Sequence, residues 1–219
     1  MTLDIDVVSD FVCPWCRLGR ARLEHAVEHF LIDRPDVQVR INWLPYFLNP
    51  DTPLAGEPYR PFLEKKFGSA RAVDALFARV REAAISDSLH FAFETIGVRP
   101  NTLRAHRLIY RAQSRGETNE RVQALVGAVF EAYFVEGRDI GDVHTLADLA
   151  AACGARRERV VEYLEGEEDA PAVRRIAGQL GRQGVEGVPF FIFNRSLAVS
   201  GAQSVAALGA ALAQAADAA

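Results

Sequence analysis

The chain has 219 residues, of which 49% are hydrophobic and 25% charged, and its formal net charge is −4. This composition is typical of a globular protein with enough chain to bury a core. The small excess of acidic residues argues against a nucleic-acid-binding or polybasic membrane-binding surface, and no apolar run approaches the length that spans a membrane.

The N-terminal part predicts a β-α-β unit. Residues 3–8 alternate apolar and polar side chains before becoming fully apolar, as a strand does, and residues 37–42 alternate again. Between them, residues 16–32 carry apolar side chains at close to helical spacing. A unit of this length favours parallel strands joined by a right-handed crossover. Residues 45–61 contain five prolines and are expected to form an irregular loop.

The middle of the chain, residues 62–183, is expected to be helical throughout. Amphipathic stripes such as Val122, Val126 and Val129 predict the core of a helical bundle. Thr145 begins a capping-box-like pattern that is typical of a helix start.

The strand signal returns near the C-terminus. Residues 190–193 (FFIF) predict a buried strand, and residues 197–199 a second strand after a short connection. A final helix follows, with Val205, Leu208 and Leu212 on one face. The predicted order is therefore β-α-β, a helical block, and β-β-α.

Two cysteines open the first predicted helix, in the segment Cys13-Pro14-Trp15-Cys16. Pro14 suits this position, because its fixed φ fits the first helical turn and its missing N–H would have had no partner there. The free backbone N–H groups and the positive end of the helix dipole favour a thiolate at Cys13. We therefore predict a redox pair with Cys13 as an exposed nucleophile and Cys16 as a shielded resolving thiol.

A zinc site and a purely structural cysteine pair are the alternative interpretations. His25 and His29 follow the cysteines at a spacing shorter than that of the usual zinc finger. On one helix, Cys16 and His25 would be separated by roughly 13 Å, so they could not share a metal ion. The two histidines also match a His-x-x-Glu-His pattern, but a further carboxylate would be needed. No metal site is expected, and Cys153 is predicted to be a buried free thiol on a helix.

The chain resembles the DsbA-like thioredoxin family, FrnE-like branch, along nearly all of its length. Five separated segments carry the resemblance: residues 9–16 (SDFVCPWC), 101–106 (NTLRAH), 136–142 (EGRDIGD), 187–191 (GVPFF) and 200–203 (SGAQ). It implies an α/β thioredoxin fold (β-α-β … β-β-α) with a large all-α insertion domain. Residues 1–60 and 184–219 would form the thioredoxin-like domain, and residues 61–183 the insertion.

The resemblance also implies that the Val188–Pro189 peptide bond is cis and lies beside the cysteines. The Val188 backbone would then pair with an extended substrate by strand addition, whereas the alternative is an ordinary trans turn proline. Pro14, Trp15, Val188 and Pro189 are therefore the expected neighbours of the thiols. Candidate substrate-binding residues are Phe11, Asn101, His106, Gly201, Ala202 and Gln203. Phe11, Trp15, Trp43 and Phe190 would form either an apolar substrate surface or ordinary core.

The expected activity is thiol–disulfide exchange with protein or peptide thiols and disulfides. Glutathione is a candidate co-substrate, and no other cofactor is expected. Trp15 replaces the histidine typical of periplasmic oxidants, which leaves the direction of the reaction open. Three cysteines do not make a disulfide framework and the N-terminal segment lacks a signal-peptide pattern, so the expected location is the cytoplasm. A homodimer is left open.

Two other functions are retained as alternatives. The kappa glutathione transferases and 2-hydroxychromene-2-carboxylate isomerases share the Asn-Thr-x-x-Ala-His and Val-Pro elements, but usually carry serine at the position of Cys13. In them, glutathione lies near the equivalents of Val188–Pro189 and residues 201–203. The second alternative is a non-catalytic redox-sensing or chaperone-like module. The additional C-terminal cysteine pair of some FrnE-like proteins is absent here, which puts a two-disulfide relay in doubt.

Overall fold

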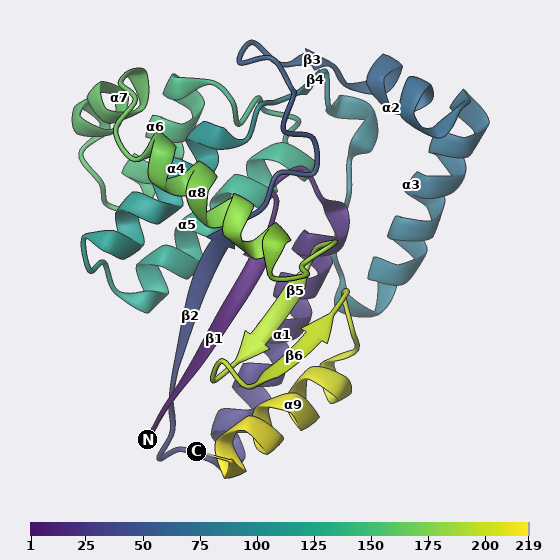
Figure 1. The fold of residues 1–219 in the computed structure, drawn as a ribbon. Coiled ribbons are helices and arrows are strands. Elements are labelled where there is room, and N and C mark those ends of the chain that lie inside the picture. The colour runs from purple at the N-terminus through teal and green to yellow at the C-terminus, as the bar shows by residue number, and fades with distance from the viewer. Residues whose placement is uncertain (219) are drawn as a thin grey trace. The chain divides into compact units, whose positions relative to one another are not determined.

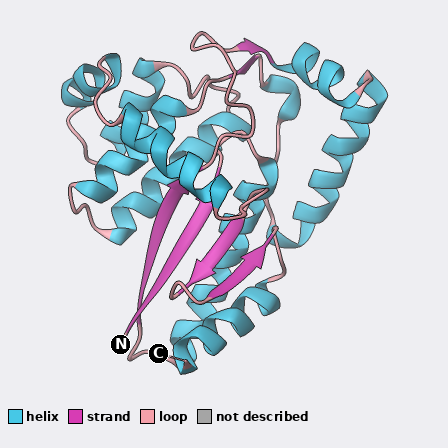
Figure 2. Cartoon of the chain, in the orientation of Figure 1, coloured by secondary structure: helices cyan, strands magenta, loops and turns pink. Residues whose placement is uncertain are grey.

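The computed structural model describes residues 1–218, and the chain forms two compact units. The first, which we call the sheet unit, consists of Met1–Tyr46 and of the chain from Arg174 onward. The second, the helical unit, is the continuous segment Phe47–Val173. Figures 1 and 2 show that the sheet unit holds the four longer strands, whereas the helical unit is almost entirely helix and loop.

A four-stranded sheet with the order β2-β1-β5-β6 forms the centre of the sheet unit. The strand β1 (Thr2–Ser9) is parallel to β2 (Gln38–Pro45), and β5 (Phe190–Phe193) is antiparallel to β1. The strand β6 (Leu197–Ser200) pairs antiparallel with β5. The predicted parallel β-α-β unit and the predicted C-terminal strand pair are both confirmed.

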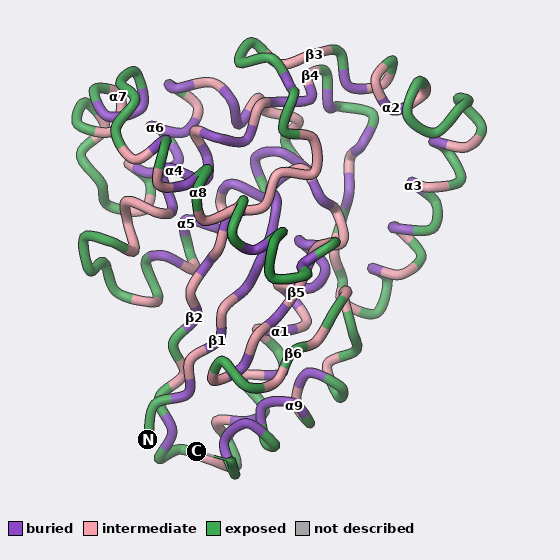
Figure 3. The backbone as a smooth tube through the Cα atoms, viewed as in Figure 1, coloured by how far each residue is buried: buried purple, intermediate pink, exposed green. Residues whose placement is uncertain are grey.

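Helices cover the sheet because β1 presents apolar side chains to both of its faces. Leu3, Ile5 and Val7 are buried on one face, where α1 (Pro14–Asp33) packs together with α9 (Val205–Asp217). In Figure 1, α1 passes behind the strands. The opposite face is apolar only near the end of β1, where Val8 packs with Leu180 of α8. Figure 3 shows β1 as a largely buried strand.

The helical unit contains α2 to α7 and the first turn of α8. These helices are α2 (Tyr59–Phe67), α3 (Ala70–Ala84), α4 (Leu103–Ser114), α5 (Asn119–Phe134), α6 (Val143–Ala152), α7 (Arg157–Glu165) and α8 (Ala170–Arg182). Two 3₁₀ turns, Ile85–Asp87 and Phe93–Thr95, follow α3. The apolar stripe of α5 is buried, as its helical spacing predicts.

Two short strands in the helical unit depart from the sequence-based expectation. The segment expected to be an irregular loop contains β3 (Glu57–Pro58), and β4 (Val98–Arg99) interrupts the region expected to be helical throughout. The two strands pair antiparallel, with Glu57 opposite Arg99. The guanidinium of Arg99 lies 3.3 Å from the Glu57 carboxylate. This pairing joins residues far apart in sequence, so no local sequence pattern predicts it.

The boundaries of the two units differ from the expected domain divisions at 60/61 and 183/184. Phe47 packs on Leu103, Ala170 and Val173 and therefore belongs to the helical unit. The second half of α8 belongs instead to the sheet unit, because Leu180 packs on Val8 and Val185 there. One helix thus contributes its two ends to the cores of different units.

The start of α6 also differs from the expectation. Asp142, rather than Thr145, is the N-cap, and its carboxylate accepts a hydrogen bond of 2.7 Å from the Thr145 backbone N–H. Asp is as good an N-cap as Ser or Thr, and the residue three positions later supplies the donor in either case. None of the helices formed by residues 1–218 has the length and apolar character needed to cross a membrane.

Candidate active site

The cysteine pair occupies the first turn of α1. Cys13 is the N-cap, with extended backbone angles of φ −95° and ψ 112°, and a proline follows it within the first turn. The backbone N–H of Cys16 donates to the Cys13 carbonyl at 3.0 Å. The strand-to-helix junction therefore holds both thiols at one helix end, as the sequence predicted.

The prediction that Cys13 is exposed was wrong. Only 4% of its surface is accessible, against 1% for Cys16. The reason lies in a segment distant in sequence, because the Cys13 thiol points at the carbonyl oxygen of Val188 with an S···O distance of 3.7 Å. The Val188 backbone therefore contacts the Cys13 sulfur directly.

The surroundings of Cys16 favour its neutral form. Burial raises the pKa of the Cys16 thiol well above its usual range, and the hydrogen bond with the Cys13 side chain and the charge of Cys13 add to the effect. The Ser9 hydroxyl and the Asp10 backbone act in the opposite direction and offset part of the rise in the pKa of Cys16. Both cysteines are free thiols in this structure.

The loop before β5 lies directly against α1. Its Val188–Pro189 peptide bond is cis. A Cβ atom added at Gly19 would lie 2.9 Å from Cγ of Pro189 and 3.1 Å from Cζ of Phe191. Glycine is therefore required at this point of α1 if the helix is to approach the proline so closely.

Three of the predicted substrate-binding residues, Gly201, Ala202 and Gln203, follow β6, and the first of them contacts this loop. Gly201, at φ +81°, donates its backbone N–H to the Pro189 carbonyl at 2.9 Å. The carbonyl of Ala202 accepts a hydrogen bond of 2.8 Å from the Arg22 guanidinium of α1. The side-chain amide of Gln203 donates to the Ser200 carbonyl. The contact of all three with substrate stays a prediction, and among the described residues Gly201 alone of them bonds to the proline loop.

The four aromatic residues near the cysteines divide into two groups. Phe11 and Trp43 are core residues, with 2% and 5% of their surface exposed. Trp15 and Phe190 are half-buried. The expected apolar surface of four rings is therefore reduced to Trp15 and Phe190, because the other two rings fill the interior of the sheet unit.

Asn101 and His106 belong to the helical unit. The Asn101 side chain donates to the Thr52 carbonyl at 2.6 Å and accepts a hydrogen bond from the Leu103 backbone N–H at 3.0 Å. His106 is buried on α4, with its ring edge-on to Phe47 at a centroid distance of 5.2 Å. Both residues shape the start of α4 and its packing, and their role toward a substrate stays a prediction.

Sequence reasoning missed four residues that support the site. Ser9 and the Asp10 backbone contact Cys16, Gly19 admits the proline loop, and Arg22 holds Ala202. Only Gly19 left a usable signal, because glycine in a helix interior is unfavourable and calls for a packing reason.

The remaining candidate ligands do not form a cluster. Within residues 1–218, no group of three or more His, Cys, Asp or Glu side chains is placed to hold a metal ion. His25 and His29 are exposed on α1. Cys153 is a free thiol, as predicted, but it is half-buried and directly follows α6 as its C-cap, so its predicted burial and its predicted place within a helix were wrong. Because α6 ends at Ala152, the Cys153 side chain lies just beyond the helix and is partly exposed.

The model of the DSBA-like thioredoxin domain family matches residues 4–213. The chain therefore belongs to this family, and the predicted thioredoxin fold with a helical insertion is confirmed. A probable DsbA oxidoreductase from Streptomyces coelicolor is 30% identical, covers 98% of this chain and 90% of its own, and superposes with a TM-score of 0.84. At the level of the family, these findings support a thiol–disulfide oxidoreductase or isomerase.

More distant structures share the fold. A 2-hydroxychromene-2-carboxylate isomerase is 17% identical with a TM-score of 0.67, and covers 99% of both chains. The cytosolic disulfide reductase DsbM of Pseudomonas aeruginosa, solved with GSH, is 17% identical with a TM-score of 0.60 and covers 96% of this chain and 98% of its own. By sequence, the uncharacterized protein YwbO of Bacillus subtilis is 25% identical over 154 residues, which are 70% of this chain and 68% of YwbO.

Proposed function

We propose that this protein is a thiol–disulfide oxidoreductase in which Cys13 attacks the substrate and Cys16 resolves the mixed disulfide. One observation carries the proposal: both thiols share the first turn of α1, and the Cys13 sulfur faces the Val188 carbonyl next to Pro189. This arrangement brings together a nucleophile and a second thiol one turn away. It also places beside them a backbone carbonyl, that of Val188, to which a substrate could bind.

In the proposed reaction, the Cys13 thiolate attacks one sulfur of a substrate disulfide. The substrate S–S bond breaks, a Cys13–substrate disulfide forms, and the other substrate sulfur leaves as a thiolate. Cys16 then loses its proton and attacks the Cys13 sulfur, which releases the second substrate thiol. The substrate has been reduced by two electrons and the cysteine pair oxidised to a disulfide, and the reverse sequence oxidises a dithiol.

The local contacts support this order of events. Burial raises the pKa of Cys16 and keeps its proton in place until the second step. When Cys13 loses its proton it can no longer donate to the Val188 carbonyl. That carbonyl then becomes available to a backbone N–H of an extended substrate, as in strand addition.

The proposed substrates are thiols and disulfides of proteins or peptides, with glutathione as a co-substrate and no other cofactor. The similarity to DsbM, whose structure was solved with GSH, makes glutathione the first small thiol to test. The proposed location is the cytoplasm, where a dithiol meets a reducing glutathione pool. DsbM is itself described as cytosolic.

Trapping the intermediate tests the proposal. The Cys16→Ser variant, incubated with oxidised glutathione, is expected to retain one glutathione on Cys13, because the resolving thiol is missing. The Cys13→Ser variant should retain none at Cys16, and a Cys153→Ser variant should behave as the unmodified protein does. Peptide mass spectrometry identifies the modified cysteine. Capture at Cys16 instead of Cys13 would reverse the assigned roles.

A redox titration separates the remaining alternatives. In glutathione buffers the cysteine pair is expected to equilibrate near or above the cytosolic potential, as an exchangeable pair requires. A pair that never forms the Cys13–Cys16 disulfide would favour the glutathione-dependent isomerase or transferase, a fold-level relationship that the 2-hydroxychromene-2-carboxylate isomerase motivates. Unchanged biological activity after Cys13→Ser replacement would favour a non-catalytic sensing or peptide-binding module.

A further inference from the structure

A cavity lies entirely within the helical unit. It has a volume of about 330 Å³ and is lined by residues of α4, α5, α6 and α7 and of the loops between them. This volume is in the range of sites that hold small organic ligands. All of its residues belong to Phe47–Val173, whereas Cys13, Cys16 and Val188 belong to the sheet unit.

The inner wall of this cavity is apolar. Leu108 of α4, Leu125 of α5 and Ala150 of α6 are buried, and Val160 of α7 is half-buried. These side chains come from four different helices and together form an apolar floor. Because it is apolar, this floor can contact the apolar part of a ligand.

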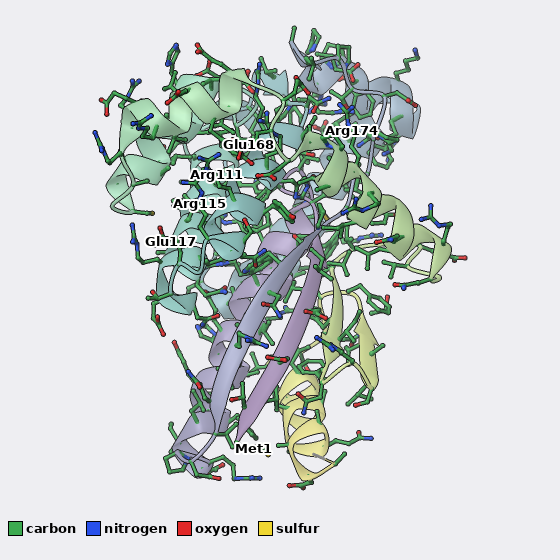
Figure 4. The ribbon with its side chains drawn as sticks, turned by 60° about the vertical axis from the view of Figure 1, so that its left-hand side comes forward. Met1, Arg111, Arg115, Glu117, Glu168 and Arg174 are labelled. Carbon is green, nitrogen blue, oxygen red and sulfur yellow. The ribbon has the colours of Figure 1, made fainter. Side chains whose placement is uncertain are left out.

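The rim is strongly basic. Five arginines line the cavity, Arg111, Arg115, Arg121, Arg156 and Arg159, together with a single carboxylate, that of Glu117. In Figure 4, the labelled Glu168, Arg111, Arg115 and Glu117 follow one another along this side of the helical unit. The concentration of positive charge stands out in a chain whose formal net charge is −4.

Carboxylates neutralise three of the five arginines. Arg111 pairs with Glu168 at 3.0 Å, Arg121 with Glu117, and Arg159 with Glu162 at 2.9 Å. Arg115 and Arg156 have no carboxylate within 4.0 Å among the described residues. Two guanidinium groups are therefore left without a countercharge at the rim.

Two of the paired arginines are held in place by further contacts. The Arg111 guanidinium lies over the Tyr163 ring, 3.9 Å from its centroid, and the Arg121 guanidinium donates to the Cys153 carbonyl at 3.2 Å. Fixed guanidinium groups lose less conformational entropy when a ligand binds, and their planar forks match the oxygens of phosphate and carboxylate groups.

We propose that this cavity binds a small organic dianion: a phosphate or dicarboxylate head group on a compact apolar body. Arg115 and Arg156 would bind the head group, since two uncompensated positive charges balance two negative ones. The apolar body would contact Leu108 and Leu125. The site is independent of the proposed redox activity, so either assignment stands or falls without the other.

Phenyl phosphate is the probe, because its phosphate is a dianion above about pH 7 and its ring supplies the apolar body. Calorimetric titration of the intact protein is expected to show binding of phenyl phosphate. Phenol lacks the charge and inorganic phosphate lacks the ring, so each should bind at least about tenfold more weakly. Equal binding of phenyl phosphate and inorganic phosphate would overturn the proposal, since the apolar floor would then contribute nothing.

Paired variants locate the binding site. The double variant Arg115→Gln/Arg156→Gln should bind phenyl phosphate at least about tenfold more weakly. Arg71→Gln serves as the matched control, because Arg71 is also exposed in the helical unit but does not line the cavity. Equal affinity in the double variant and the control would refute the role of the two arginines. Because both side chains are exposed, the exchange to glutamine should leave the melting temperature unchanged.

Cys153 provides a second readout in the unmodified protein, because this residue lines the cavity. Saturating phenyl phosphate is expected to slow the alkylation of Cys153 by iodoacetamide, measured by peptide mass spectrometry with Cys13 as the internal reference. Alkylation of Cys153 at the same rate with and without the probe would place any bound phenyl phosphate elsewhere and overturn the proposal.

Discussion

At Cys16, burial and reactivity oppose each other. The side chain is 1% exposed, and this burial raises the pKa of its thiol well above the usual range. The nearby Ser9 hydroxyl and Asp10 backbone lower this pKa in part. A resolving thiol that stays protonated gives the mixed disulfide at Cys13 time to exchange with substrate before the internal disulfide closes.

The raised pKa of Cys16 predicts a pH dependence of stability for the reduced protein. Above the ordinary thiol pKa of about 8.5, the unfolded chain loses this proton while the folded chain keeps it. The free energy of unfolding should therefore fall as the pH rises from there toward the folded-state pKa, by at most about 1.4 kcal/mol per pH unit. Urea unfolding from pH 7 to pH 10 measures it. The oxidised protein, in which Cys16 has no proton to lose, is the control and should lack this component.

At Gly19, the absence of a Cβ atom allows α1 to pack closely against Pro189. A Cβ atom there would meet Pro189 at 2.9 Å, so Gly19→Ala is expected to displace the proline loop and to destabilise the protein by about 1–3 kcal/mol. It should also slow the exchange reaction. The outcome opposes helix propensity, since alanine in a helix is favoured over glycine by about 1 kcal/mol.

Gly209→Ala is the matched control for Gly19. It lies within α9, and a Cβ atom there would meet nothing within 4 Å. This exchange should stabilise the protein slightly and leave the exchange rate unchanged. If both alanine variants were equally stable and active, the close approach of α1 to Pro189 would have no energetic consequence.

At the scale of elements, the helix starts depend on single side chains. Burial alone would raise the pKa of Asp142, but hydrogen bonds from the backbone and side chain of Thr145, together with the charge and backbone N–H of His144, lower the pKa below the usual value. The same contacts satisfy a backbone N–H at the start of α6 that no helical carbonyl can reach. Stability and ionisation at this cap are therefore coupled.

Replacement of Asp142 by alanine is expected to cost about 1 kcal/mol, the usual contribution of an N-cap. Because the folded-state pKa is lowered, the contribution is fully present above the unfolded value of about 3.9 and is lost as the pH falls through the folded-state pKa. Asp142→Asn should keep most of the cap without this pH dependence. Thermal melts between pH 2 and pH 7 distinguish the three proteins, and parallel curves would contradict the assignment.

At the scale of the whole molecule, α8 serves two cores. Its first residues, Ala170 and Val173, pack within the helical unit, and Leu180 near its other end packs within the sheet unit. A single continuous helix thus crosses the boundary between the two compact units. A truncation at either expected domain boundary would remove residues that belong to the core of a unit.

Leu180→Ala is expected to destabilise the sheet unit by about 2–5 kcal/mol, because the side chain is 5% exposed and its cluster contains Val8 and Val185. Amide hydrogen exchange should accelerate in β1 and β5 more than in α5. Gln179→Ala, an exposed change on the same helix, should leave both rates unchanged. Equal acceleration in all three elements would mean that the two units open together.

Much of the fold was predictable because it depends on local patterns. The strand β1 corresponds to the alternation of residues 3–8, and α1 to the helical spacing after Cys16. The strand β5 corresponds to the apolar run of residues 190–193. The position of the cysteine pair at a strand-to-helix junction followed from the same patterns. The strands β3 and β4 did not, because each has only two residues and exists by pairing with the other.

The amino-acid sequence by itself determined the order of the longer elements and placed two thiols in the first turn of α1, since both depend on neighbours within a few residues. Only the tertiary structure decided that the Val188 carbonyl contacts the Cys13 thiol and that Pro189 packs closely against Gly19. The tertiary structure also decided that the two ends of α8 belong to the cores of different units. It also gathered five arginines around one cavity. Each of these features joins segments that are distant along the chain, and periodicity carries no information about which distant side chains will meet.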